Sequence, residues 1–144
     1  MTAQRSTREQ KLYNKNRKAE VGQACPFCGM NPGHPQFVRE TKHLKVLRNR
    51  TPYSLWDDQG VLDHLMIIPK VHTDKLGDLT PEGAAEFIRL VGEYETQGYA
   101  LYARPLGSAS RSVAHQHTHL IQLNGKRRNL LLMLRKPWYF RLSK

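Results

Sequence analysis

Short runs of apolar residues, separated by turn residues, predict several strands along this 144-residue chain. Residues 43–48 form the first run. Residues 64–68 form the second, which ends at Pro69 because proline cannot donate to a strand ladder. Residues 99–103 form a third run, and a loop over residues 104–112 follows it. We predict that each of these runs is a strand.

One stretch in the middle of the chain has helical spacing instead. Thr80 offers a capping hydroxyl, Pro81 suits the first helical position, and Glu82 supplies an acid in the first turn. Apolar residues then recur every three or four positions, and a glycine at position 98 is suited to end the helix. The predicted apolar face consists of Ala84, Phe87, Ile88, Val91 and Tyr94.

Residues 113–123 predict a further strand, which carries a row of three histidines. Because side chains alternate between the two faces of a strand, His115, His117 and His119 should project to one side. Gln116 should point to the other side, where its amide needs a buried partner. Three imidazoles that titrate near neutrality suit a nucleophile, an acid or base, or a set of metal ligands.

Both ends of the chain differ from this pattern. We predict a turn at residues 124–125, a short helix over residues 130–134 and a last strand over residues 138–142. A helix over residues 8–20 would have Leu12 as its only large aliphatic residue, so the N-terminal stretch is predicted to be a mobile arm. Mixed strands with one long helix indicate the α+β class.

The formal net charge of +11 is concentrated at the two ends. Residues 1–20 contain six Lys/Arg and two Glu, residues 126–144 contain seven Lys/Arg and no acid, and residues 21–125 contain ten of each sign. We therefore divide the chain into a basic N-terminal extension (1–24), a central domain (25–125) and a basic C-terminal segment. Basic tails of this kind indicate either a nucleic-acid partner or solvated surface charge.

Location and redox chemistry follow from three features. No apolar run approaches the length of a membrane span, so no membrane partner is expected. The N-terminus is polar and basic and lacks the apolar core of a secretory signal, which favours a cytoplasmic location. Cys25 and Cys28 are the only cysteines and form one Cys-x-x-Cys pair, which indicates a metal site, a redox pair or inert thiols.

The histidine segment resembles the signature of the histidine-triad (HIT) superfamily of nucleotide hydrolases and transferases. Residues 115–121 (HQHTHLI) carry that resemblance. Three other segments match the family in the same order: residues 46–53 (VLRNRTPY), residues 64–72 (HLMIIPKVH) and residues 79–82 (LTPE). The resemblance covers roughly residues 25–123. It implies a HIT-like fold, with a five-stranded antiparallel sheet and one main helix packed on a face.

The resemblance also implies a division of labour. His117 would attack the α-phosphorus of a dinucleoside polyphosphate or a nucleoside phosphoramidate and form a nucleotidyl-histidine intermediate. His119 would contact the phosphoryl oxygens, on which the transition state accumulates negative charge. Ser112 and the loop before it would complete the phosphate cradle, while His64 would approach the nucleotide or pack within its strand. The candidate phosphate and nucleotide ligands are Asn49, His64, Arg104, Gly107, Ser108, Arg111 and Ser112.

The sequence departs from the family pattern at several positions. Gln116 and Thr118 stand where the family prefers apolar residues between the histidines. Arg104 and Arg111 stand where many members carry Asn and Gln, and a planar guanidinium can hold phosphate through two hydrogen bonds. We therefore expect a substrate with more phosphate charge than a simple nucleoside monophosphate ester. Asn49 is the candidate ribose ligand.

Zinc is the metal that the resemblance implies for the cysteine pair. Two thiolates do not close a tetrahedral site, so two nitrogen ligands are required. In zinc-bearing members these come from the histidine of the Ile-Pro-Lys-x-His segment and from the first histidine of the triad. Here those positions are His72 and His115, which with Cys25 and Cys28 would make a structural zinc site. Without metal, His115 would be an outer proton-relay residue.

Three functions are compatible with these patterns. The first is a HIT-type nucleotide hydrolase or nucleotidyl transferase that acts on a small nucleotide and, like many HIT proteins of this size, forms a homodimer. The second is a relative that removes nucleotidyl groups from DNA or RNA ends, with the basic tails bound to phosphates. The third is a non-catalytic nucleotide sensor, which the complete triad disfavours.

Overall fold

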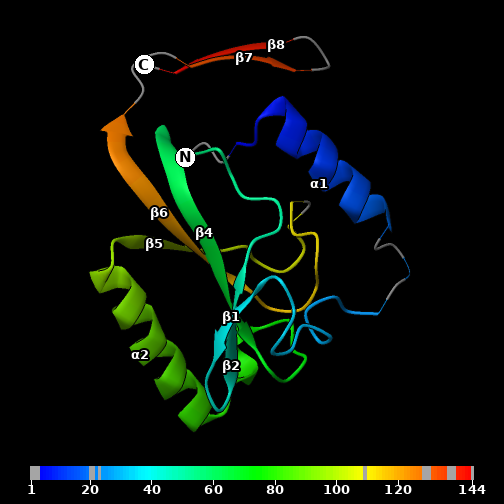
Figure 1. The fold of residues 1–144 in the computed structure, drawn as a ribbon, viewed down its shortest axis with the longest axis vertical. Helices are drawn as coiled ribbons and strands as arrows, with labels where there is room; N and C mark the ends of the chain where they lie inside the picture. The colour runs from blue at the N-terminus through cyan, green and yellow to red at the C-terminus, as the bar shows by residue number, and fades with distance from the viewer. Residues whose placement is uncertain are drawn as a thin grey trace.

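The computed structural model describes residues 4–19, 22, 24–108, 110–127, 131–135 and 139–143 (Figure 1). Within these ranges the helices are α1 (Thr7–Ala19), the short 3₁₀ turn η1 (Leu76–Asp78) and α2 (Pro81–Thr96). The strands are β1 (Phe37–Glu40), β2 (Leu44–Arg48), β3 (Leu55–Trp56), β4 (Gln59–Pro69), β5 (Tyr99–Ala103), β6 (Thr118–Arg127), β7 (Leu131–Arg135) and β8 (Tyr139–Ser143).

The first six strands form one antiparallel sheet. Its order is β1-β2-β4-β6-β5, and β3 pairs with β4 beside this path. The long strands β4 and β6 pair with each other at the centre of the sheet. The predicted α+β class and HIT-like sheet are therefore confirmed, with five strands along the main path and β3 as a sixth.

The two faces of the sheet pack against different parts of the chain. The cluster between the sheet and α2 contains Leu44, Val46, Leu65, Ile67, Leu90, Tyr94 and Leu120. The cluster on the opposite face contains Phe27, Met30, Leu47, Met66 and Ile68. Successive residues of β2 and β4 alternate between the two clusters, as side chains on a strand must. The predicted main helix on one face is confirmed, and the other face receives the Cys-x-x-Cys turn.

Helix α2 begins as predicted but buries a different stripe. Thr80 Oγ1 accepts a hydrogen bond from the Gly83 N–H at 3.2 Å. Gly83 and Leu90 are buried, whereas Ile88 is 67% exposed and Ala84 is also exposed, so the predicted face was wrong at Ala84 and Ile88 and missed Leu90. The reason is the close approach at Gly83, where an added Cβ would lie 3.6 Å from the His43 side chain. The buried stripe therefore starts one residue earlier than predicted.

Residues Thr7–Ala19 form helix α1, so the predicted mobile arm was wrong. Ser6 and Glu9 form a capping box: Ser6 Oγ accepts from the Glu9 N–H at 3.3 Å, and Glu9 Oε2 accepts from the Ser6 N–H at 2.9 Å. Burial opposes the charge on Glu9, but hydrogen bonds from Ser54 and Ser6 outweigh it and lower the pKa of Glu9. Since α1 buries no residue of its own, this cap and its contact with Ser54 hold the helix in place.

Strand β6 begins later than predicted. It starts at Thr118, so His115 and His117 precede the strand instead of lying within it. The ladder between β4 and β6 stops there because β4 ends at Pro69, which has no N–H. The Pro69 carbonyl is engaged by the His115 ring at 3.0 Å. The segment before Thr118 is therefore held by this side-chain contact and by the Gln116 N–H, which donates to the Thr73 carbonyl at 2.6 Å.

The C-terminal predictions need correction in two places. Strand β6 continues through residues 124–125 to Arg127, where we expected a turn. The predicted short helix is strand β7, which pairs with β8 in a separate two-stranded antiparallel sheet. Short apolar runs do not distinguish helix from strand by periodicity, and here a neighbouring partner strand decides the outcome. No helix in the described ranges is both long and apolar enough to cross a membrane.

Candidate active site

Three buried histidines gather on the face of the sheet that α2 leaves uncovered. The β4–β6 register sets Met66 opposite His119, so His64 lies diagonally across from His119. The ring centroids of His64 and His119 lie 5.0 Å apart, as do those of His117 and His119. His64, His119 and His117 therefore form one continuous row, built from β4, β6 and the segment just before β6.

A single hydrogen bond fixes the tautomer of His117. Its Nδ1 lies 2.9 Å from the carbonyl oxygen of His115, and a carbonyl can only accept, so Nδ1 carries the proton. The Nε2 atom of neutral His117 then keeps its lone pair. Because His117 lines the main pocket of this face, the lone pair is available to a ligand bound there.

A chain of hydrogen bonds fixes the other two rings. The backbone N–H of Tyr53 donates to His64 Nδ1 at 3.2 Å, so neutral His64 carries its proton on Nε2. That atom lies 2.9 Å from His119 Nδ1, which accepts the bond; the Asn49 amide nitrogen, 3.3 Å from the same His64 Nε2, is itself a donor and cannot accept from it. His119 therefore carries its own proton on Nε2 and is a donor in the pocket that it lines. The two pocket histidines thus offer opposite functions, a lone pair on His117 and an N–H on His119.

Burial favours the neutral form of all three rings. Desolvation, to which the charge of Arg5 adds, lowers the pKa of His64 to about 3. Burial is also the main cause that lowers the pKa of His117, and two nearby arginines act in the same direction. Burial and the neighbouring His64 hold the pKa of His119 well below its ordinary value. At pH 7 the site therefore contains neutral imidazoles, as the tautomers require.

The main pocket brings together five of the predicted site residues. His117 and His119 line it with Ser112, Arg104 and Asn49. Arg104 donates from one guanidinium nitrogen to the Tyr53 hydroxyl at 2.9 Å, which holds this cation at the pocket wall. A ring nitrogen with a lone pair, a neutral donor, a hydroxyl and a cation thus meet in one place.

The other predicted ligands lie outside this lining. His64 stands behind His119 and orients it. Gly107 and Ser108 lie earlier in the loop, where the Ser108 carbonyl accepts from the Arg111 N–H at 2.9 Å. Their contact with phosphate stays a prediction.

Arg111 is engaged by oxygens of the protein itself. Its guanidinium donates to the carbonyls of Ala114 at 2.6 Å and Asp74 at 2.8 Å, and to Gln116 Oε1 at 3.2 Å. These bonds hold the segment that precedes β6 and give Gln116 the buried partner that its amide was expected to need. Thr118, the other departure from the family pattern, is buried, and its Oγ1 has no partner in the described part of the chain.

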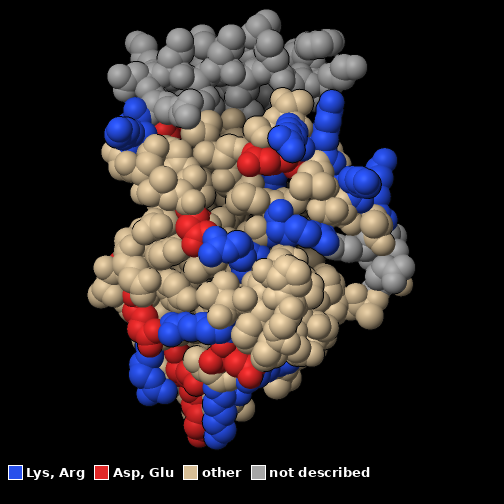
Figure 2. Space-filling model, in the orientation of Figure 1, with Lys and Arg blue, Asp and Glu red and all other residues tan. Residues whose placement is uncertain are grey.

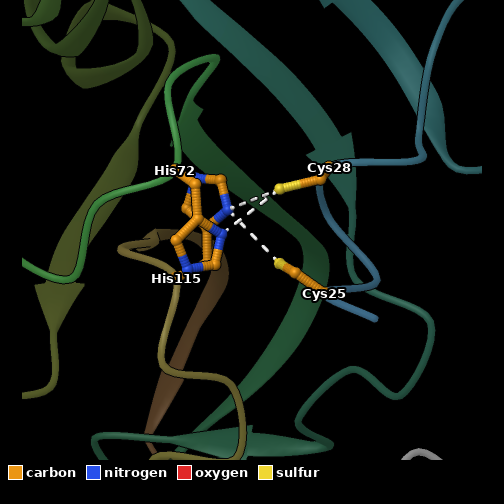
Figure 3. A group of neighbouring side chains, drawn as sticks. All are labelled: Cys25, Cys28, His72 and His115. Carbon is orange, nitrogen blue, oxygen red and sulfur yellow. Dashed lines mark hydrogen bonds between the residues drawn. The ribbon is translucent and has the colours of Figure 1, made fainter. Parts of the chain in front are cut away.

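A second cluster lies beside this row, where Cys25, Cys28, His72 and His115 converge (Figure 3). Their candidate ligand atoms all lie within 4.8 Å of one another, and both thiols are free. His115 Nδ1 lies 3.4 Å from Cys25 Sγ and 3.6 Å from Cys28 Sγ, and His72 Nδ1 lies 3.3 Å from Cys28 Sγ. Figure 3 shows both sulfur atoms directed toward the two imidazoles. The four predicted ligands are therefore close enough to hold a metal ion.

Two further contacts position these ligands. His115 Nε2 lies 3.0 Å from the Pro69 carbonyl oxygen, so Nε2 carries the proton and Nδ1 is free to bind metal. The buried Lys45 ammonium holds the Cys-x-x-Cys turn by donating to the Met30 carbonyl at 2.9 Å and to Asn31 Oδ1 at 3.2 Å. Lys45 was not predicted as part of the site. Only the alternation of side chains along a strand indicated this role, because it places position 45 on the same face as position 47.

The N-terminal side of the pocket was also not predicted. Arg5, Tyr13, Asn16 and Arg17 line it together with Tyr53. The guanidinium carbon of Arg5 lies 4.5 Å from the Tyr53 ring centroid and 4.2 Å from that of Tyr13. The Ser-x-x-Glu capping box was the available signal for a helix here, but it carries no information about where that helix lies.

Solved structures with a similar fold are histidine-triad proteins. A HIT family protein from Bacillus anthracis is 26% identical, with a TM-score of 0.54, over 71% of this chain and 74% of that chain. A HIT family hydrolase from Legionella pneumophila is 23% identical, with a TM-score of 0.51, over 72% of this chain and 95% of that chain. A histidine triad nucleotide-binding protein from Candida albicans is 22% identical, with a TM-score of 0.53, over 67% and 73%. The chain therefore has the histidine-triad fold.

No family model and no curated protein matches the chain. The comparison therefore shows a similarity of fold, and the chemistry of the site is inferred from the residues of this chain.

We expect Arg104→Gln to raise the pKa of His117, because the charge of Arg104 disfavours a second cation beside it. In the wild type the lowered pKa of His117 should keep the ring neutral at pH 7, and the ring should gain its proton at a lower pH than an ordinary imidazole. Nitrogen chemical shifts of the imidazole rings, followed through a pH titration, report both the pKa and the tautomer.

The matched control for this titration is Arg89→Gln on the exposed side of α2, which should leave the His117 curve unchanged. A wild-type His117 ring that is protonated at pH 7, or that carries its neutral proton on Nε2, would contradict the hydrogen-bond assignment.

Proposed function

We propose that the protein is a nucleotide hydrolase or nucleotidyl transferase that cleaves a bond to the α-phosphorus through a covalent His117 intermediate. The observation that carries this proposal is the pair of opposite tautomers in one pocket. His117 has a free Nε2 lone pair, and His119 has an Nε2–H donor. A neutral nucleophile beside a fixed donor suits attack on an anionic phosphorus centre, where added negative charge must be stabilised.

The proposed step is a displacement at phosphorus. His117 Nε2 forms a bond to the α-phosphorus while the bond to the leaving group breaks, and the electron pair departs with that group. The Nδ1–H bond to the His115 carbonyl, at 2.9 Å, holds the ring while it gains positive charge. Water or another acceptor then attacks the same phosphorus, loses its proton and releases neutral His117. His119, Ser112 and Arg104 would donate to the phosphoryl oxygens throughout.

The names of two proteins with this fold agree with the proposal. The Legionella pneumophila protein is called a hydrolase and the Candida albicans protein is called nucleotide-binding. This agreement supports the reaction class, while the leaving group must be inferred from the pocket itself.

Other predictions stand beside this one. Removal of nucleotidyl groups from DNA or RNA ends is the alternative reaction, and a nucleotide sensor is the alternative without chemistry. The homodimer and the cytoplasmic location also stay predictions from the sequence.

We further propose that Cys25, Cys28, His72 and His115 hold a structural zinc ion. Zinc bonds of about 2.3 Å to sulfur and about 2.0 Å to nitrogen separate the two ligand atoms by about 3.6 Å in a tetrahedral site. The sulfur-to-nitrogen distances of 3.3, 3.4 and 3.6 Å fit that geometry. A bound ion would tie the N-terminal turn to the loops that carry the histidines and so stabilise the site.

Substitution of His117 tests the nucleophile. We expect His117→Ala to lower kcat about 1000-fold or more on an adenosine 5′-phosphate ester, because no other group supplies the attacking lone pair. Steady-state kinetics measure the loss. His34→Ala, outside both clusters, is the control and should turn over at the wild-type rate. An active His117→Ala protein would refute the assignment.

Metal analysis tests the zinc site. We expect about one zinc per chain in untagged protein, measured by plasma mass spectrometry, because four ligands of the preferred types are preassembled. Cys28→Ser and His72→Ala should lose most of the metal and unfold at a lower temperature. Val71→Ala, an exposed neighbour that offers no ligand atom, should keep both properties. A metal-free wild type with unchanged stability would contradict the proposal.

A further inference from the structure

The segment before the central domain forms one wall of the pocket that holds His117. Arg5 comes from the stretch before α1, and Tyr13, Asn16 and Arg17 come from α1 itself. Figure 1 shows α1 alongside the sheet, far from α2. From the sequence this segment was predicted to be a mobile arm, with nucleic-acid phosphates as the alternative partner of its basic residues, and it was not predicted to line the pocket.

Backbone hydrogen bonds attach this wall to the sheet. The Gln4 N–H donates to the Leu55 carbonyl at 2.9 Å, and the Gln4 carbonyl accepts from the N–H groups of Ser54 at 2.7 Å and Leu55 at 3.1 Å. The Ser6 N–H donates to Ser54 Oγ at 2.7 Å, and Gln4 itself is buried. These hydrogen bonds pair Gln4 with Leu55 as neighbouring strands are paired. They therefore fix the start of α1 against the sheet.

Ring contacts give the order of groups along the pocket. Phe27 lies 5.3 Å from His117, His117 lies 5.0 Å from His119, and His119 lies 6.0 Å from Tyr53, between ring centroids. The Arg5 guanidinium covers the Tyr53 ring at 4.5 Å. The nucleophile therefore has an apolar end of the pocket on one side and a cationic, aromatic end on the other. A nucleoside suits the first end, which leaves the second for the group that departs.

The cationic end carries an excess of positive charge. Arg5, Arg17 and Arg104 line the pocket, and no Asp or Glu is among its described lining residues. No carboxylate of the described ranges forms an ion pair with Arg5, Arg17 or Arg104. Figure 2 shows basic side chains gathered over α1, whose sequence has five Lys/Arg and one Glu. Cations gathered at a pocket whose described lining has no carboxylate attract an anionic ligand.

The pocket also lacks a strong proton donor for a leaving group. Its described lining has no carboxylic acid and no lysine. An amine leaving group needs a proton as its bond to phosphorus breaks. A phosphate leaving group departs as a stable anion and needs only counter-charge, which arginines supply.

We propose that the N-terminal segment is a subsite for the leaving group and that this leaving group is a polyphosphate chain, held by Arg5 and Arg17. The inference rests on the proposed function of His117. In the step, the bond between the α-phosphorus and the bridging oxygen breaks, and the oxygen keeps the electron pair. The bond from phosphorus to His117 Nε2 forms. The polyphosphate leaves as an anion between the arginines, so Arg5 and Arg17 determine specificity and do not take part in bond making.

The test compares two substrates that share adenosine but differ in the leaving group. Diadenosine tetraphosphate loses a polyphosphate, and the p-nitrophenyl ester of adenosine 5′-monophosphate loses a group without phosphate. We expect Arg17→Gln to lower the ratio of kcat/KM for diadenosine tetraphosphate to kcat/KM for the p-nitrophenyl ester about tenfold. The reason is the loss of one charge-assisted contact with the leaving group. Because Arg17 is exposed in the last turn of α1, its substitution leaves the attachment of the helix intact. Arg5→Gln should lower the same ratio.

Arg8→Gln is the matched control, because it removes the same charge from the same helix at a residue outside the pocket lining. It should keep the wild-type ratio. An unchanged ratio in both Arg17→Gln and Arg5→Gln, with a wild type active on both substrates, would overturn the subsite and leave the proposed function standing. A wild type inactive on both would overturn both proposals. Turnover confined to a 5′-adenylated oligonucleotide would overturn the polyphosphate subsite in favour of nucleic acid.

Discussion

The register between β4 and β6 is the constraint on which the rest of this structure depends. It sets Met66 opposite His119 and so brings His64 diagonally against His119, within 2.9 Å between their ring nitrogens. The same register sends Leu65 and Leu120 to the opposite face, under α2. A slip of one residue would exchange the two faces and bury the histidines in the apolar cluster. Core packing and active-site geometry are therefore specified by a single pairing.

The end of that ladder matters as much as its register. Because Pro69 cannot continue β4 as a donor, the chain before Thr118 is free of strand pairing and is held by side-chain contacts and by the hydrogen bond from the Gln116 N–H to the Thr73 carbonyl. This release lets the His115 ring lie against Cys25 while its carbonyl fixes the proton of His117. One residue thus contributes its ring to the Cys/His cluster and its backbone carbonyl to the position of the His117 ring. A regular strand would have given three equivalent histidines.

The sequence predicted the parts of the site that depend on local pattern. The pairing of Cys25 with His115 followed from ligand chemistry and resemblance. Strands β2, β4, β5 and β6 followed from their apolar runs, and the sheet that they form was implied by the resemblance. The N-terminal wall did not follow, because α1 buries no apolar stripe and is held by the Ser6–Glu9 cap and by a bridge at Gln4. Tertiary contacts between polar groups determine where α1 lies, and such contacts produce no periodic pattern of apolar residues in the sequence.

The central claim is that His117 becomes covalently attached to the nucleotide, and trapping that adduct tests it most directly. The wild-type protein is mixed with excess diadenosine tetraphosphate, quenched within milliseconds under alkaline conditions, and digested for peptide mass mapping. The account predicts one adenylyl group per chain on the peptide that contains His117, with fragment ions that assign it to that ring. Full turnover without an adduct at any quench time, or an adduct on His119 or His64, would contradict it.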